Sequence, residues 1–235
     1  TLLTFAGTEF TVIGLQGTDT VTSVNLTSTG AAANAPVGTY TIIPSAAVGS
    51  GLGNYAIIYV AGQLDVNQAT LTFTPGNKTK LYGAVFTAYT GAFTGLMGFD
   101  SVTPIYDSLG APATALVSPP PYDITVSFTD PGDKLRNYIL TVDPATLTVQ
   151  PRTLTVTPTN RSKFYGDVLT SADFTGTISG IQNGDAITAT YDSPLGDPAT
   201  ATVAAPGPTY PIVATLSDPD GMLGNYTLVN NVGTL

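Results

Sequence analysis

The chain repeats itself, and this internal repetition limits its fold more than any other feature of the sequence. A Leu-x-Asn-Tyr step occurs three times, with its asparagine at Asn54, Asn137 and Asn225. The second asparagine follows the first by 83 residues, and the third follows the second by 88. Self-similarity at a nearly fixed period is typical of chains built from stacked copies of one small unit. The sequence therefore predicts three copies of one domain.

Two further signatures recur in every copy. One is Gly-[Leu/Ile]-x-x-x-Asp-x-[Val/Ile], with its acid at Asp19, Asp100 and Asp185. The other is a tyrosine that opens a strand 14 or 15 residues before each asparagine, at Tyr40, Tyr122 and Tyr210. Matched Thr-Leu-Thr openings start the second and third copies, so we expect domains at residues 1–69, 70–152 and 153–235.

The copies differ at two places. The first copy has no opening strand, because the chain starts inside it, and it has no Tyr-Gly step like Tyr82-Gly83 or Tyr165-Gly166. The third copy carries about five extra residues, which we place in the loop Pro194–Pro208. The sequence shows no signal-peptide pattern, so we interpret the chain as a mature or excised segment.

The local pattern of each copy is that of β-strands. Leu71–Phe73 and Leu154–Val156 alternate with threonine, which is the period of a half-buried strand. Asp-Pro steps at Asp130–Gly132 and Asp218–Gly221 have turn chemistry. Helical periodicity is absent apart from one short turn expected near Gly180–Asp185. The predicted fold class is all-β, with strands also expected at Ala186–Tyr191, Tyr210–Leu216 and Tyr226–Val229.

The junctions between copies are short. Leu64–Leu71 and Leu147–Leu154 each connect two strands through only a few residues. Neither junction contains the Gly/Ser-rich stretch of a flexible linker. Short joints between domains of similar size predict a stiff, elongated array.

Several segments of the chain resemble the MBG repeats of the YGX type. The resemblance covers essentially the whole chain, and it is carried by RTLTVTP (152–158), SKFYGD (162–167), FTGTISGIQNGDAITATY (174–191) and TYPIVATLSDPDGMLGNYTL (209–228). It implies small β-rich domains described as β-grasp-like, in long tandem arrays of bacterial adhesins and filamentous-haemagglutinin-like surface exoproteins. The strand pattern by itself fits an Ig-like sandwich equally well, so both topologies remain open.

Composition excludes several classes of function. Histidine and cysteine are absent, which removes Ser-His-Asp and Cys-His catalysis and the corresponding metal sites. The chain has only seven basic residues and a net charge of −9. Phosphate binding needs clustered Lys and Arg, so nucleic acid is not an expected partner. No apolar run approaches the roughly 20 residues that a membrane span requires. We therefore expect no enzyme, no nucleic-acid binding and no membrane insertion.

Acidic side chains are the remaining candidates for metal chemistry. Ca²⁺ takes hard oxygen ligands, and the secondary candidates for it are Asp130, Asp133, Asp218 and Asp220. The competing interpretation is that these residues build turns. The first copy has Ala46–Gly49 at the equivalent place, so no repeat-wide calcium site and no other cofactor is expected.

The residues repeated in every copy are predicted to be structural. Asp19, Asp100 and Asp185 are interpreted as caps or Asx-turns, which satisfy nearby backbone N–H groups, and the three repeated asparagines are interpreted in the same way. Tyr55, Tyr138 and Tyr226 follow those asparagines and are predicted to be buried in equivalent positions.

These features favour a stalk or spacer of a secreted bacterial cell-surface adhesin, which is extracellular and supports cell adhesion and biofilm attachment. Its expected partners are the neighbouring repeats of the same polypeptide. Two alternatives stay open. The repeats themselves bind a surface glycan or protein, or the incomplete first copy accepts a strand from another chain, so that the protein self-assembles.

Overall fold

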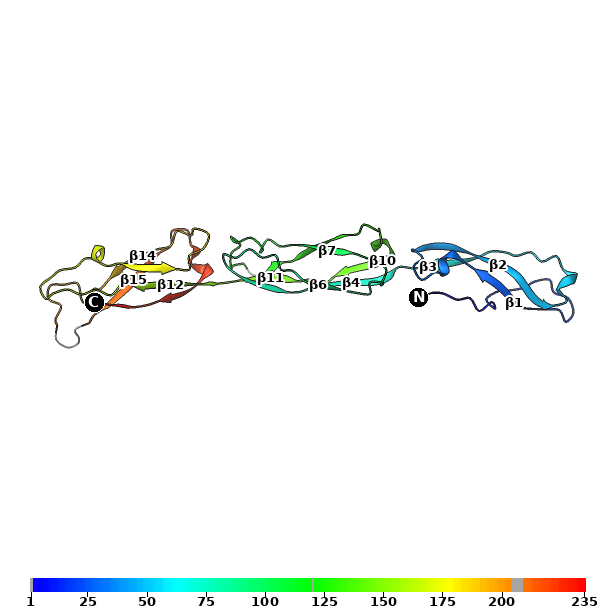
Figure 1. The fold of residues 1–235 in the computed structure, drawn as a ribbon, viewed down its shortest axis with the longest axis horizontal. Coiled ribbons are helices and arrows are strands. Elements are labelled where there is room, and N and C mark those ends of the chain that lie inside the picture. The colour runs from blue at the N-terminus through cyan, green and yellow to red at the C-terminus, as the bar shows by residue number, and fades with distance from the viewer. Residues whose placement is uncertain (1, 120, 204–208) are drawn as a thin grey trace. The chain divides into compact units, whose positions relative to one another are not determined.

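The structure is a computed structural model that describes residues 2–119, 121–203 and 209–235 (Figure 1). The described chain forms β-strands and five short 3₁₀ turns, and no helix in it is long and apolar enough to cross a bilayer. The strands are β1 (Thr20–Thr27), β2 (Gly38–Ser50), β3 (Gly62–Val66), β4 (Ala69–Pro75), β5 (Lys78–Leu81), β6 (Gly91–Thr94), β7 (Thr103–Asp107), β8 (Tyr122–Asp123), β9 (Thr125–Thr129), β10 (Tyr138–Val142), β11 (Thr146–Gln150), β12 (Arg152–Pro158), β13 (Gly176–Ser179), β14 (Thr188–Asp192), β15 (Pro211–Ser217), β16 (Tyr226–Asn230) and β17 (Gly233–Thr234).

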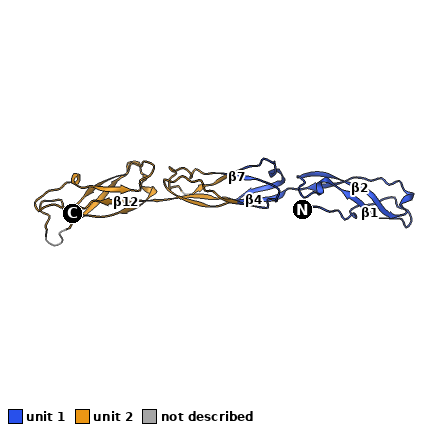
Figure 2. Cartoon of the chain, viewed as in Figure 1, with its two compact units in different colours: residues 1–74, 92–105, 128–143 blue, residues 75–91, 106–127, 144–235 orange. Residues whose placement is uncertain are grey.

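The chain divides into two compact units (Figure 2). Unit 1 contains residues 1–74, 92–105 and 128–143, and unit 2 contains residues 75–91, 106–127 and 144–235. The limits of the units run through the second repeat, and each unit contains one junction between repeats. The domain boundaries expected at residues 69–70 and 152–153 stay predictions.

The third repeat lies entirely in unit 2 and has two three-stranded sheets. In the first, the opening strand β12 pairs in parallel with β16 and antiparallel with β13. In the second, β15 lies between β14 and β17, and both pairings are antiparallel. The strands predicted from the alternating pattern are confirmed at β12, β14, β15 and β16. The parallel pair distinguishes the repeat from the purely antiparallel sheets of an immunoglobulin sandwich.

The core of this repeat is built from residues of both sheets. Val156 on β12, Tyr191 on β14 and Ile212 on β15 form one buried cluster together with Phe174 and Leu235. Val156 and Ile212 are completely inaccessible to solvent. Alternate residues of each strand point inward, because successive side chains of a strand face opposite sides of the sheet.

Unit 1 contains the same parallel pairing and one antiparallel sheet. The opening strand β4 pairs in parallel with β10, with Leu71 opposite Leu140. The ring of Phe73 on β4 lies 4.6 Å from that of Phe93 and 5.3 Å from that of Phe128. In the first repeat β2 lies between β1 and β3, and all pairs are antiparallel.

The first repeat lacks a partner for one segment. Residues 55–59 correspond to β10 and β16 of the other repeats, but in the described chain they form no strand. Ile58 in this segment is 85% exposed, and Val60 just after it is 81% exposed. Strand donation to this segment remains a prediction.

The helical turns are not where the sequence suggested. The three Leu-x-Asn steps form 3₁₀ turns within Leu52–Asn54, Leu135–Asn137 and Met222–Asn225, and the other two 3₁₀ turns are Thr29–Ala31 and Ser171–Asp173. Residues Gly180–Asp185 instead form a hydrogen-bonded turn, in which the Asp185 N–H donates to Gln182 O at 2.9 Å. The expected insertion in Pro194–Pro208 includes residues 204–208, which lie outside the described part of the chain.

Candidate functional site

Two of the repeated signatures meet in every repeat. The hydroxyl of the tyrosine after each Leu-x-Asn donates to the carboxylate of the repeated aspartate. The Tyr55–Asp19 distance is 2.8 Å and the Tyr226–Asp185 distance is 2.6 Å, and Tyr138 makes the same bond to Asp100. The aspartates were expected to cap backbone N–H groups. The structure gives their carboxylates a tyrosine hydroxyl instead.

Each of these tyrosine oxygens also accepts a backbone N–H. The donors are Gln16, Met97 and Gln182, at 2.8, 3.1 and 2.9 Å. Burial, followed by the hydrogen bond to Asp185, raises the pKa of Tyr226 to about 12. Tyr138 and Tyr226 are 5% and 8% exposed, whereas Tyr55 is only half-buried. The phenol therefore stays protonated and holds two segments of its repeat together.

The repeated asparagine reaches across the junction to the preceding repeat. In unit 1 the Asn137 Oδ1 accepts the backbone N–H of Val37 at 2.9 Å. In unit 2 the Asn225 Oδ1 accepts the backbone N–H of Val117, also at 2.9 Å. These asparagines were expected to bond within their own turns, and Asn225 does this as well, because its Nδ2 donates to Met222 O at 3.2 Å. Asn54, in the first repeat, is exposed.

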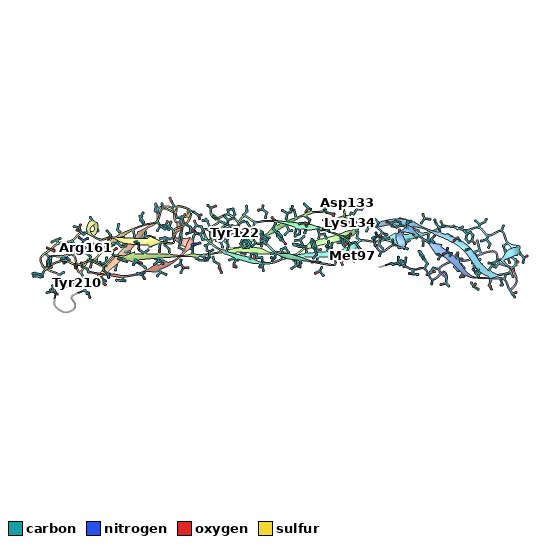
Figure 3. The ribbon with its side chains drawn as sticks, viewed as in Figure 1. Met97, Tyr122, Asp133, Lys134, Arg161 and Tyr210 are labelled. Atoms are coloured by element: carbon teal, nitrogen blue, oxygen red, sulfur yellow. The ribbon has the colours of Figure 1, made fainter. Side chains whose placement is uncertain are left out.

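The tyrosine that opens a strand before each repeated asparagine bonds the carbonyl oxygen of the same peptide group. Tyr40 donates to Pro36 O at 2.6 Å, and Tyr122, marked in Figure 3, donates to Leu116 O at 2.9 Å. The carbonyl of residue 36 and the N–H of Val37 belong to one peptide unit. That unit is therefore fixed by a tyrosine of its own repeat and an asparagine of the next.

We call this arrangement of tyrosine, peptide group and asparagine the junction clamp. It occurs in both units with the same partners, and a backbone amide fixed at both ends has little freedom to rotate. A net intramolecular hydrogen bond contributes about 0.5–1.5 kcal/mol, so the clamp acts mainly by fixing the geometry of the junction.

The second junction has an additional contact that the first lacks. Tyr82, of the Tyr-Gly step, is 2% exposed, and its hydroxyl lies 3.0 Å from Asp185 Oδ2. Its ring meets that of Tyr226 edge-on at 5.4 Å. Across the same junction, Asn183 Nδ2 donates to Ala113 O at 3.1 Å. The tyrosine of the Tyr-Gly step in the second repeat thus packs against the Asp–Tyr pair of the third repeat.

Two lysines hold equivalent loops of the second and third repeats, and sequence reasoning missed them. Lys80 is 6% exposed, and its ammonium donates to the carbonyls of Ala84, Ala111 and Pro112. Burial lowers the pKa of Lys80. Lys163 makes the equivalent bonds in the third repeat, to Asp167, Asp197 and Pro198. Both lysines stand two residues before Tyr-Gly, a recurrence that was visible in the sequence.

The secondary calcium candidates lie in capped turns. Asp130 accepts the N–H groups of Lys134 and Leu135 at 2.9 and 2.7 Å, and these bonds lower the pKa of its carboxyl. Asp218 accepts two N–H groups in the same way, both at 2.8 Å. Asp133 forms an exposed ion pair with Arg136, and no side-chain bond is seen for Asp220 in the described chain. Within the described ranges, no cluster of three or more acidic side chains could hold a metal.

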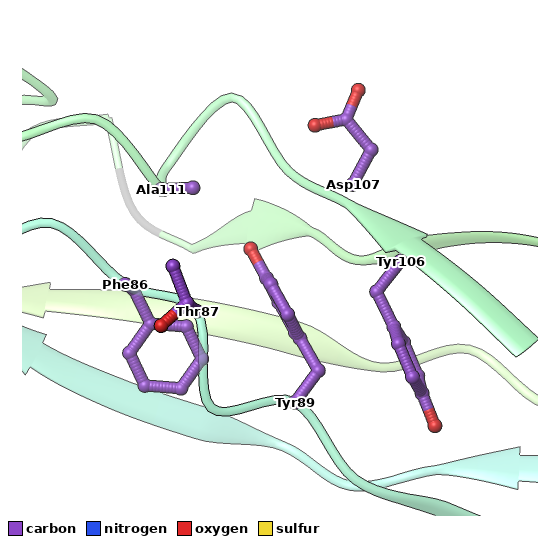
Figure 4. Close-up of a pocket in the computed structure, with 6 residues that line it drawn as sticks. All are labelled: Phe86, Thr87, Tyr89, Tyr106, Asp107 and Ala111. Carbon is purple, nitrogen blue, oxygen red and sulfur yellow. The ribbon is translucent and has the colours of Figure 1, made fainter.

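Unit 2 also contains an aromatic pocket of about 390 Å³ (Figure 4). The rings of Tyr89 and Tyr106 stack at 5.3 Å, and Phe86 meets Tyr89 edge-on at 5.0 Å. Figure 4 shows the hydroxyls of the two tyrosines pointing in opposite directions. The Tyr89 hydroxyl is buried without a hydrogen-bond partner in the described chain. Sequence reasoning named no such pocket, because its residues are not repeated.

The comparisons with known proteins agree with the repeat pattern. A search of curated proteins finds no match to this chain. The family model described as MBG domain (YGX type) matches three successive segments, residues 4–65, 71–148 and 154–235. These segments contain all three Leu-x-Asn-Tyr steps and both complete junction clamps. The chain therefore belongs to the MBG domain (YGX type) family, of which it carries three tandem repeats.

Proposed function

We propose that this chain is a spacer of a bacterial cell-surface adhesin, located outside the cell, where it holds a binding domain at a distance from the membrane. In this role the chain catalyses nothing, and its principal partners are its own neighbouring repeats. As part of the adhesin, the spacer supports cell adhesion and biofilm attachment.

The junction clamp is the observation that carries this proposal. A spacer must resist bending at its joints, and each joint here fixes one peptide group between Tyr and Asn of successive repeats. The recurring residues form bonds within a repeat or across a junction between repeats, as expected for a structural role. Membership of the MBG family agrees with a structural role.

Small-angle scattering on the monomer tests the spacer. Three stiffly joined bodies of about 80 residues should give a radius of gyration near 30 Å, whereas a single globule of this length would give about 17–18 Å. A value below about 20 Å would contradict the proposal. Asn225→Ala and Asn54→Ala are the matched variants, because they make the same change and, in the described chain, only Asn225 of the two accepts a backbone N–H of another repeat. We expect Asn225→Ala alone to broaden the distribution of interatomic distances.

Carbohydrate binding is a second candidate, and the aromatic pocket of unit 2 favours it. Small-molecule sites combine aromatic surfaces with a few polar groups that fix orientation. Here Phe86, Tyr89 and Tyr106 supply the rings, and the exposed carboxylate of Asp107 supplies a polar group.

A glycan array probed with the full chain tests this second candidate. We expect at least one glycan to bind, and Asp107→Ala to weaken that binding about tenfold by removing one hydrogen bond while keeping the rings. Asp123→Ala is the control, because Asp123 is also exposed but lies outside the pocket. An array without any bound glycan, or equal binding by Asp107→Ala, would remove the candidate.

A further inference from the structure

The third repeat contains a pair of neighbouring aspartates that the second repeat lacks. Asp192 ends β14 and corresponds to Asp107, which ends β7, since each follows a tyrosine and precedes a serine. Asp197, in the loop after β14, precedes a proline at the position where the second repeat has Ala111. The two loops are otherwise held alike, because their carbonyl groups at this position bond to equivalent lysines. The second repeat therefore shows the same loop without the second carboxyl group.

The carboxyl groups of Asp192 and Asp197 are hydrogen-bonded to each other. A carboxylate only accepts hydrogen bonds, so a bond between two carboxyl groups requires a proton on one of them. Asp197 Oδ1 is buried, and no hydrogen-bond donor of the described chain reaches it. The geometry of the pair is therefore that of two acids that hold one proton.

The surroundings favour the protonated form of Asp197. Burial, followed by the hydrogen bond and the charge of Asp192, raises the pKa of Asp197 to about 6. The Ser193 N–H and the Lys163 ammonium act in the opposite direction but do not cancel this rise. Lys163 Nζ donates to three backbone carbonyls, at 3.0, 3.0 and 2.7 Å, so its charge is shared among neutral groups.

The other titratable groups near the pair have partners of their own. Asp167, on the segment after β12, accepts a backbone N–H at 3.0 Å. On the 3₁₀ turn that contacts β14, Asp173 pairs with Arg161 at 3.5 Å. The Tyr210 hydroxyl donates to a backbone carbonyl at 2.8 Å. Strands β13 and β15 carry no ionisable side chain, and residues 204–208 contain none. Proton uptake by this loop is therefore assigned to the aspartate pair.

We propose that Asp192 and Asp197 form a proton-binding site that makes the stability of the third repeat depend on pH. With one shared proton, the pair bonds the end of β14 to the loop that follows. Without it, two negative charges repel each other in a partly buried site. Since the pKa of Asp197 lies above its ordinary value of about 4, this stabilisation is complete below about pH 4 and is lost as the pH rises through about 6. The second repeat, with Ala111 in place of the second acid, should not respond in this way.

Asp197→Asn tests the site, because its amide can donate to Asp192 at any pH. Urea unfolding of the full chain, followed by the amide signals of β14 and β15 in NMR spectra, is compared at about pH 5 and about pH 7.5. Over this range the ratio of folded to unfolded third repeat should fall about tenfold more in the unmodified chain than in Asp197→Asn, because pH 5 lies about one unit below the pKa of Asp197. Asp220→Asn is the control, since it makes the same change at an exposed carboxyl of the same repeat, and it should behave like the unmodified chain.

An NMR titration of the carboxyl carbons gives a second measure that does not depend on unfolding. The Asp197 carboxyl should titrate near pH 6 in the unmodified chain. In Asp192→Asn it should titrate about one unit lower or more, because the shared proton and the repulsion are both lost. A midpoint below about pH 5 in the unmodified chain, the same midpoint in Asp192→Asn, or a pH dependence of unfolding that Asp197→Asn leaves unchanged would overturn the proposal.

Discussion

Replacing Tyr82 by alanine is expected to lower the free energy of unfolding by about 3–5 kcal/mol, as for other buried aromatic residues. The change removes a ring that is 2% exposed and belongs to a cluster with Val149, Leu154 and Tyr226. It also removes the hydroxyl that Asp185 accepts. Urea unfolding of the full chain, followed by tyrosine fluorescence and circular dichroism, measures the loss.

Tyr165→Ala is the matched control, because it makes the same change in the same Tyr-Gly motif. Tyr165 is 69% exposed, so its replacement should change stability by no more than about 0.5 kcal/mol. The contrast tests whether Tyr-Gly acts at a junction and not within its own repeat. Equal losses in the two variants would show that the motif stabilises each repeat internally and would contradict our interpretation of the second junction.

Replacing Tyr226 by alanine should cost a comparable amount, about 3–5 kcal/mol. The ring packs in the core of unit 2, and its hydroxyl bridges Asp185 and the Gln182 N–H. Tyr226→Phe keeps the ring and leaves the Asp185 carboxylate with one donor fewer, for which we expect a loss of about 1–3 kcal/mol. Both values follow from equilibrium unfolding monitored by circular dichroism.

The corresponding variant of the first repeat provides the comparison. Tyr55 makes the same bonds to Asp19 and Gln16 but is only half-buried. Tyr55→Ala should therefore cost clearly less than Tyr226→Ala. If Tyr55→Ala were as destabilising as Tyr226→Ala, the bonds alone would account for the effect, and burial could not be its main cause.

Much of the fold was predictable, because its signals are local. Alternating Leu and Thr residues identified β4 and β12, and the Asp-Pro steps marked turns that the carboxylates of Asp130 and Asp218 do cap. The helical turn was misplaced. The Leu-x-Asn step is too short to show helical periodicity, so its 3₁₀ geometry left no pattern to detect.

The candidate site was predictable only in part. Repetition identified the aspartates, asparagines and tyrosines, and the sequence predicted a structural role for them. The hydrogen-bond partners predicted for the aspartates were wrong, because a carboxylate near a turn is equally able to accept a backbone N–H or a distant hydroxyl. Asp185 meets the hydroxyl of Tyr226, which is 41 residues away along the chain.

The sequence by itself determined that this protein is a tandem array of three β-repeats, because the order of residue types shows the number of copies, their period and their strand pattern. The tertiary structure alone decided how one repeat holds the next. The clamp joins Val37 to Asn137 over 100 residues, and Val117 to Asn225 over 108. Its donor is a backbone N–H, which nearly every residue possesses. No residue type marks such a donor, and only folding brings one particular amide to the asparagine.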